Sequence, residues 1–168
     1  MRRLAELEQR VAELERGQAA RVREPGPGDE DDDEARFWAL HGLQRRLPEG
    51  AGAVLFTGVV PMPTGGQYIW QQGADTAALL DEDWSALSQQ LNALGHPVRL
   101  LLLRRVLSGA RTAAELQELE GLGTSGQLYH HLRPLVAAGW LRATARGQYE
   151  VPGSRVVPLL VVLSAMER

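Results

Sequence analysis

The feature that most constrains this chain is a pair of helix-start signals separated by a turn that contains two glycines. Thr112 with Glu115, in TAAE, forms a capping box that predicts a short helix of about six residues. Thr124 with Gln127, in TSGQ, repeats the capping box and predicts a second helix over residues 125–138. Two helices joined by a short glycine-bearing turn are typical of the helix-turn-helix motif.

The residues on both sides extend this motif. Pro97 suits the first turn of a helix, and the following VRLLLLRRVL is apolar nearly all round, which predicts a buried central helix. Gly139 ends the second helix of the motif, and WLRATARGQYEVPG predicts two short strands around Arg146 and Gly147. A helix, a helix-turn-helix and a hairpin in this order predict a winged helix over residues 85–153.

The second helix of the motif has a face that suits DNA. Leucines at 128, 132 and 135, with Val136, form its buried stripe and turn polar side chains outward. Gln bonds adenine, Arg bonds guanine or phosphate, and the first N–H groups of a helix hold a phosphate. Arginines in the wing suit the DNA backbone or minor groove. The candidate DNA-binding residues are Thr124, Ser125, Gln127, Tyr129, His130, Arg133, Arg142 and Arg146.

Three stretches of the chain resemble a known family. ALGHPVRLLLLRRVLSG, TAAELQELEGLGTSGQLYHHLRPLVAAGWL and RGQYEV are similar to the winged helix of ArsR-type bacterial transcriptional regulators, over about residues 85–166. The resemblance implies a dimeric repressor whose terminal helices form the dimer interface. Residues 154–168 fit that role, since Ser154 can cap a helix that is too apolar for a solvent-exposed position. Residues 1–80 lie outside the resemblance.

The sequence argues against a metal or another cofactor. Family members that sense metals use Cys in the helix-turn-helix, or His and carboxylates on the terminal helix. This chain has no Cys, and its terminal segment has no His. His130 and His131 are adjacent on a helix, so they point about 100° apart and cannot hold one ion together. His96 is expected to begin the helix at Pro97.

The N-terminal residues predict two further segments. In residues 1–16, Leu4, Leu7, Val11 and Leu14 follow a heptad pattern, with charges placed for a parallel homodimeric coiled coil. A single surface helix is the alternative, because two heptads are marginal alone. Residues 17–34 combine Pro and Gly with an acidic block and predict a disordered linker.

Residues 35–84 predict a small module, which we expect to act as a sensor or in dimer docking. A helix is expected over 35–47, a β-hairpin from strands 53–60 and 67–72, and a helix over 79–94 that Asp81 or Asp83 can cap. Aromatic side chains are concentrated here and can line a pocket for a small-molecule effector. The alternative is that they form the module's own core or a docking surface. The candidate pocket residues are Trp38, Phe56, Tyr68 and Trp70.

Charge and motif content limit the function classes. The net charge of the 168 residues is −3, but residues 95–153 carry seven Arg against four Glu, which favours a nucleic-acid partner. No apolar run is long enough for a membrane span, and the charged first residues are unlike a signal peptide, so we expect a cytoplasmic protein. No catalytic motif is present, and we expect no enzyme activity.

The predicted fold is α+β: mainly α with small β, a winged helix-turn-helix with an N-terminal coiled-coil segment and a β-hairpin module. The predicted function is that of a homodimeric, sequence-specific DNA-binding transcriptional regulator, a repressor by analogy with the family. It would read the major groove with residues 125–138 and the backbone or minor groove with the wing, residues 140–151. The alternative is a winged-helix module for protein–protein assembly without specific DNA binding.

Overall fold

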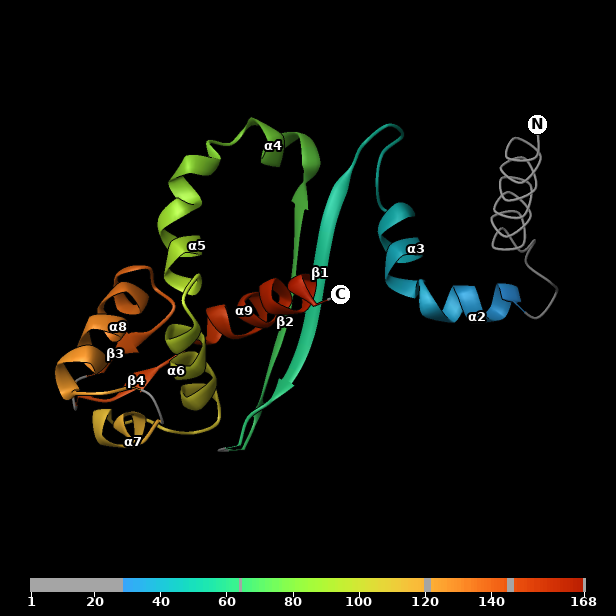
Figure 1. Cartoon of the computed structure of the whole chain (residues 1–168). Coiled ribbons are helices and arrows are strands. Elements are labelled where there is room, and N and C mark those ends of the chain that lie inside the picture. Colours follow the sequence, from blue (N-terminus) through green and yellow to red (C-terminus); the bar gives the residue numbers. More distant parts are fainter. Residues whose placement is uncertain (1–28, 64, 120–121, 145–146, 168) are drawn as a thin grey trace, which may run out of the picture. The chain divides into compact units, whose positions relative to one another are not determined.

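The structure, a computed structural model, describes residues 29–63, 65–119, 122–144 and 147–167 of the chain (Figure 1). It combines helices with two antiparallel hairpins, which confirms the predicted mixture of α and β. The chain divides into two compact units, Met1–Pro48 and Glu49–Arg168. The boundary falls inside the 35–84 segment, so the helical part of the expected module and its hairpin belong to different units.

The first unit contains α2 (Asp29–Arg36) and α3 (Trp38–Gln44). The prediction of a disordered linker over 17–34 is wrong for residues 29–34, which are helical. Arg36, in the last turn of α2, suits the negative end of the helix dipole. The helix expected over 35–47 is broken at Phe37, which has a non-helical backbone. The predicted coiled coil, residues 1–16, lies outside the described residues.

The second unit begins with a long hairpin, β1 (Ala53–Pro61) paired with β2 (Gln67–Asp75). The hairpin was predicted, but both strands extend beyond the expected 53–60 and 67–72. Its turn contains Gly65 and Gly66, with φ of 88° and 77°, a backbone conformation that other residues rarely adopt. The strands keep one register throughout, from Ala53 opposite Asp75 to Pro61 opposite Gln67.

Three short elements follow where one helix was expected over 79–94. They are α4 (Thr76–Asp81), the 3₁₀ helix η1 (Trp84–Leu87) and α5 (Ser88–Leu94). The carboxylate of Asp83 accepts from the Ser85 N–H at 2.9 Å, so Asp83 caps η1, and its extended backbone interrupts the helix. Asp83 is therefore a helix cap, as predicted, but it caps a helix that begins inside the 79–94 segment. Asp81 ends α4.

The next helices follow the sequence signals closely. They are α6 (Pro97–Leu107), α7 (Ala113–Gln117) and α8 (Ser125–Ala137). His96 begins α6, because its Nδ1 accepts from the Val98 N–H at 3.2 Å. The capping box of α7 is complete: Thr112 Oγ1 accepts from the Glu115 N–H at 3.2 Å, and Glu115 Oε2 accepts from the Thr112 N–H at 2.8 Å.

The chain ends with a short hairpin and a helix. Strand β3 (Arg142–Ala143) pairs antiparallel with β4 (Tyr149–Glu150), where the sequence predicted two short strands. The helix α9 (Gly153–Met166) follows directly. Ser154 lies within its first turn and makes no capping hydrogen bond, so the prediction that Ser154 caps this helix is wrong. Pro152 precedes the helix, where its fixed φ suits a helix start.

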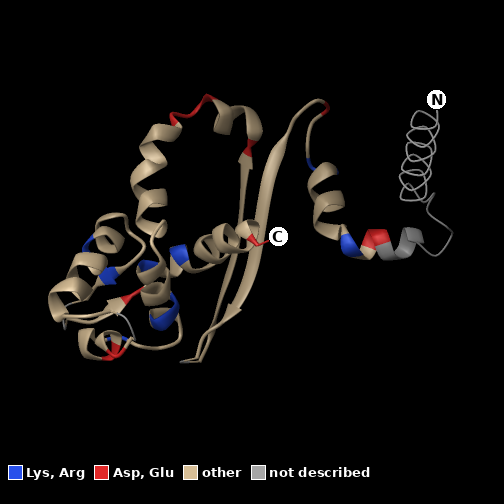
Figure 2. Cartoon of the chain, viewed as in Figure 1, with Lys and Arg blue, Asp and Glu red and all other residues tan. Residues whose placement is uncertain are grey.

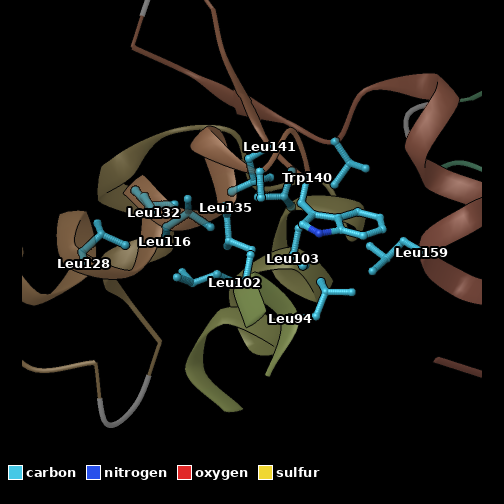
Figure 3. Close-up of a cluster of buried hydrophobic side chains, with 14 of the residues drawn as sticks. Leu94, Leu102, Leu103, Leu116, Leu128, Leu132, Leu135, Trp140, Leu141 and Leu159 are labelled. Atoms are coloured by element: carbon cyan, nitrogen blue, oxygen red, sulfur yellow. The ribbon is translucent and has the colours of Figure 1, made fainter. Parts of the chain in front are cut away.

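A hydrophobic core joins α5, α6, α7, α8 and α9 (Figure 3). Each of its fully buried leucines stabilises the fold by about 1.5–3 kcal/mol relative to exposure. Trp140 ties α5 to this core, because its buried indole donates to the Gln90 carbonyl at 2.9 Å. The buried residues labelled in Figure 3 are Leu94, Leu102, Leu103, Leu116, Leu128, Leu132, Leu135, Trp140, Leu141 and Leu159.

The long hairpin packs on α9 at two close contacts. A Cβ atom at Gly58 would stand 2.7 Å from Val157 Cγ1, and a Cβ atom at Gly153 would stand 2.7 Å from Tyr68 Cε1. Glycine is therefore required at both positions for β1, β2 and α9 to approach this closely. The hairpin crosses α9 in Figure 1.

Candidate nucleic-acid interface

The helix α8 separates an apolar face from a polar one. Leu128, Leu132 and Leu135 are buried against the core, as the predicted stripe requires. Val136, which was expected in that stripe, is 37% exposed. The opposite face is open to solvent, and it carries most of the predicted DNA-contacting side chains. Exposed among them are Thr124, Ser125, Gln127, Tyr129, His130 and Arg133.

The side chain of Gln127 has a structural role at the start of α8. Its Oε1 accepts from the Thr124 N–H at 2.9 Å. The preceding Gly123 has φ +74°, and a Cβ atom there would collide with Gln127 Oε1. Gln117 also holds this turn, by donating to the Gly123 carbonyl at 2.8 Å. A bidentate contact from Gln127 to adenine would use the same oxygen and so would compete with the capping hydrogen bond.

The first turn of α8 presents backbone donors beside small side chains. Ser125 and Gly126 are exposed, and their N–H groups are among the first four of the helix, which have no acceptor within the helix. Such donors attract an anionic group, and the helix dipole adds to the attraction. This turn can hold a phosphate group of a nucleic-acid backbone.

Arg133 lies one to two turns further along the same open face. It borders a shallow hollow of about 310 Å³ between α8 and the β3–β4 hairpin, together with Tyr129 and Tyr149. Burial and the neighbouring Tyr129 raise the pKa of Tyr149, so its hydroxyl stays neutral at physiological pH. This part of the surface thus combines one arginine with two phenol groups, all of which can contact phosphate or base edges.

Three histidines gather where α8 meets the start of α6. The rings of His96 and His131 lie 4.6 Å apart, and those of His130 and His131 lie 5.4 Å apart. Burial lowers the pKa of His131, and the positive charges of His96, His130 and Arg99 lower it further. His131 is therefore neutral near pH 7 and adds no charge to the exposed face. In the part of the chain that the structure describes, no three potential ligands are placed to hold a metal ion.

Of the two predicted DNA-binding residues in the β3–β4 hairpin, the structure describes Arg142. Arg142 is exposed in β3, but its guanidinium is paired with Glu150 across the hairpin, with Nε 2.9 Å from Oε1. This pairing neutralises part of the positive charge expected there. Arg146 lies outside the described residues.

Arginines occur on several elements around α8, as Figure 2 shows. Arg105 in α6 is paired with Glu118 at 3.6 Å, and Arg155 in α9 lies over the Trp140 ring at 5.1 Å from its centroid. These two side chains are engaged within the fold. Arg133 is the exposed cation that α8 itself carries on its open face.

The candidate pocket residues are divided between the two units. Trp38 belongs to the first unit. Phe56, Tyr68 and Trp70 share one face of the hairpin, since Gly58 pairs with Trp70 and Val60 pairs with Tyr68. This is the face that α9 covers, as the contacts of Gly58 and Tyr68 with α9 show. Of these three aromatic side chains, Tyr68 lies close against Gly153 of α9.

An apolar groove lies elsewhere, between α6 and α9. Its volume is about 490 Å³, and one charged side chain, Arg104, borders it. The sequence shows that both helices are rich in apolar residues, but it does not show that the two helices pack side by side and form a groove. The groove is lined by Pro97, Leu100, Leu101, Leu103, Arg104, Leu107, Leu159, Leu160 and Leu163.

No protein-family profile matches the chain, and no curated protein matches it either. Within the described ranges, no helix combines the length and apolar character needed to cross a bilayer. The functional conclusion therefore depends on the geometry of the second unit.

Proposed function

We propose that the protein is a sequence-specific DNA-binding regulator of transcription, in which α6, α7, α8 and the β3–β4 hairpin form a winged helix. The observation that carries the proposal is the division of α8 between a fully buried leucine face and an open polar face. A recognition helix requires this division, because it must be fixed to its domain on one side and enter the major groove with the other.

Specific roles follow for the exposed residues. The N–H groups of Ser125 and Gly126 would hold a backbone phosphate and so set the position of α8 on the duplex. Arg133 and His130, further along α8, would reach base edges in the major groove. Gln127 would hold the first turn in place rather than read a base, because its Oε1 is engaged with Thr124.

The protein would act as a homodimer. Leu160, Leu163 and Met166 expose an apolar edge of α9 beside the apolar groove of α6. Exposed apolar side chains also occur on α4, η1 and α5, at Leu80, Trp84, Leu87 and Leu91. Apolar surfaces of this extent are typical of protein interfaces. Two copies related by a two-fold axis would place two α8 helices in successive major grooves of a palindromic site.

Repression is the mode of regulation that the resemblance to ArsR-type regulators implies. A repressor of this kind occupies its operator as a dimer and blocks transcription there. Release from the operator would require a signal, and the second unit offers the α6–α9 groove as an apolar site from which such a signal can act.

The proposal is tested by selecting binding sites from random duplex DNA with the purified full chain at about 150 mM salt. Affinity for the enriched site is then measured as a function of salt concentration. An enriched palindrome whose affinity falls steeply with salt is the expected result, because Arg–phosphate contacts release counterions. Absence of enrichment, with weak and salt-insensitive association, contradicts the proposal.

The second candidate function is protein–protein assembly through the winged helix. The exposed apolar side chains of Leu80, Trp84, Leu87 and Leu91 favour it, because several such side chains on consecutive elements are typical of a protein interface. In that case self-association or partner binding would persist at high salt, while DNA binding would be absent.

A further inference from the structure

The long hairpin has two open edges. In the part of the chain that the structure describes, its sheet consists of β1 and β2 alone. Two backbone hydrogen bonds at the ends of the hairpin show which residues face the partner strand. The Met62 N–H donates to the Gly66 carbonyl, and the Thr76 N–H donates to the Gly52 carbonyl. Hydrogen-bonded pairs alternate along an antiparallel ladder, so the even-numbered residues face the partner strand. The N–H and C=O groups of the odd-numbered residues point out of the sheet.

The two open edges are not equivalent. On β2 the outward N–H groups belong to Gln67, Ile69, Gln71 and Gly73, and all four residues are exposed. On β1 the outward series ends in Pro61, which has no N–H, so the edge lacks one donor. Of the two edges, β2 thus offers the uninterrupted row of donors and acceptors that an additional strand requires.

The hairpin lacks the charges that usually protect such an edge. Residues 50–74 contain no Asp, Glu, Lys, Arg or His, although 23% of the whole chain is charged. In Figure 2 the hairpin is tan along almost its whole length. In the sequence, the nearest charged residues on either side are Glu49 and Asp75. Soluble proteins commonly place a charged side chain or an inward-facing charge on an open strand to prevent pairing with another chain. Because this edge has no charged residue, its composition does not prevent pairing with a strand of another chain.

One face of the hairpin also carries an uncovered apolar pair. Val59 and Ile69 are cross-strand partners, and they are 62% and 67% exposed. They lie on the face opposite to Gly58 and Tyr68, which contact α9. A strand added to β2 would place a further side chain beside Ile69 on this face and shield it from water.

We propose that β2 pairs along its outer edge with β2 of a second copy of this chain, forming a four-stranded antiparallel sheet across a two-fold axis. Antiparallel pairing of identical strands satisfies that symmetry, since each copy contributes the same surface. An uncharged edge matches the equally uncharged edge of a second copy and has no charge with which to select an acidic or basic partner. A four-stranded sheet is also more stable than a lone hairpin.

The pairing would continue the interface assigned above to α9, because α9 packs directly on this hairpin. In this respect it rests on the proposed homodimer. It does not depend on DNA binding, since none of the candidate DNA-contacting residues lies in β1 or β2.

Amide hydrogen exchange in the full-length wild-type protein tests the pairing residue by residue. We expect the outward amides of Ile69, Gln71 and Gly73 to be protected, and their protection to increase with protein concentration. The outward amides of Leu55, Thr57 and Val59, on the other edge, provide the comparison within the same hairpin. Fast exchange of the β2 amides at every concentration, as in a free edge, overturns the proposal, and an extended segment of another protein then becomes the candidate occupant.

A matched pair of proline variants provides the second test. Ile69→Pro removes an outward N–H from β2, and Val59→Pro removes the cross-strand partner's outward N–H from β1. Neither substitution removes a ladder hydrogen bond, because both N–H groups point out of the sheet. Sedimentation equilibrium is expected to show self-association at least about tenfold weaker for Ile69→Pro than for Val59→Pro.

Equal self-association of the two variants overturns the proposal, provided that circular dichroism shows both folded. The selection of DNA sites by the wild-type chain is a separate measurement. Failure of the hairpin pairing and failure of the DNA-binding proposal are therefore distinguished: the first leaves an enriched DNA site, and the second leaves concentration-dependent amide protection.

Discussion

Gly58 in β1 lies directly against Val157 in α9, where a methyl group at position 58 would stand 2.7 Å from Val157 Cγ1. Val157 is buried, and a β-branched side chain in a helix has essentially one rotamer, so it cannot move aside. The close packing of the hairpin on α9 thus depends on the absence of a side chain at position 58.

Gly58→Ala is expected to lower the free energy of unfolding by about 1–3 kcal/mol, because the added methyl overpacks this contact. Urea denaturation of the full chain measures the change. Gly73→Ala in the same hairpin is the control: its Cβ would lie 3.7 Å from the Val54 carbonyl, an ordinary contact. There the free energy of unfolding is expected to stay constant or to rise by up to about 1 kcal/mol. Equal destabilisation by both variants would contradict the close-packing argument.

The sequence predicted the elements between residues 96 and 139 well, because their boundaries depend on nearby residues. The capping box of Thr112 and Glu115, and the Nδ1 of His96 on the Val98 N–H, are contacts within one turn. Contacts of this kind join residues two or three positions apart, so a short sequence motif is enough to predict them. The exposed polar face of α8 was predictable for the same reason, since three buried leucines at helical spacing determine the opposite face.

Other features depend on contacts between distant residues and were not predictable. The sequence predicted one helix over residues 79–94, but Asp83 interrupts it, and the side chains of Leu80, Trp84, Leu87 and Leu91 are exposed. Gln127 was assigned to base recognition from its outward position. Its hydrogen bond to the Thr124 N–H shows that an outward side chain can serve the helix start instead. The α6–α9 groove required both helices to be placed side by side.

Arg133→Ala is expected to weaken binding to the selected DNA site by about 1–3 kcal/mol, because it removes the exposed cation of α8 from the duplex. Its thermal stability should match that of the wild type, since the side chain is exposed. Arg105→Ala is the control, because Arg105 lies on α6 and is paired with Glu118. Fluorescence anisotropy with labelled duplex DNA measures both. Equal affinity of the Arg133 variant and the wild type would exclude this side chain from the interface.

The lowered pKa of His131 predicts a dependence of stability on pH. In the unfolded chain its pKa returns to about 6.5, so below this pH the unfolded state binds more protons than the folded state. The free energy of unfolding is therefore fully retained above pH 6.5 and falls as the pH drops from 6.5 toward the lowered pKa of the folded state. Urea denaturation at pH 7.5 and at pH 5.5 measures this loss.

The variant His131→Asn tests whether this residue is responsible. It is expected to reduce the difference in stability between the two pH values, whereas His130→Asn, at an exposed neighbouring position, should retain most of it. A difference that persists in full in His131→Asn would assign the pH dependence to other groups.

Leu163→Glu is expected to weaken the homodimer at least about tenfold, because it places a carboxylate in the apolar groove between α6 and α9. Burying that charge in an interface without a partner is unfavourable, whereas the free monomer leaves it in contact with water. Ser164→Glu adds the same charge one residue later, at an exposed position whose hydroxyl donates to the Val161 carbonyl in α9. Sedimentation equilibrium of the two variants compares the effect of position at constant net charge. If both variants associate as strongly as the wild type, this edge of α9 is not part of the dimer interface.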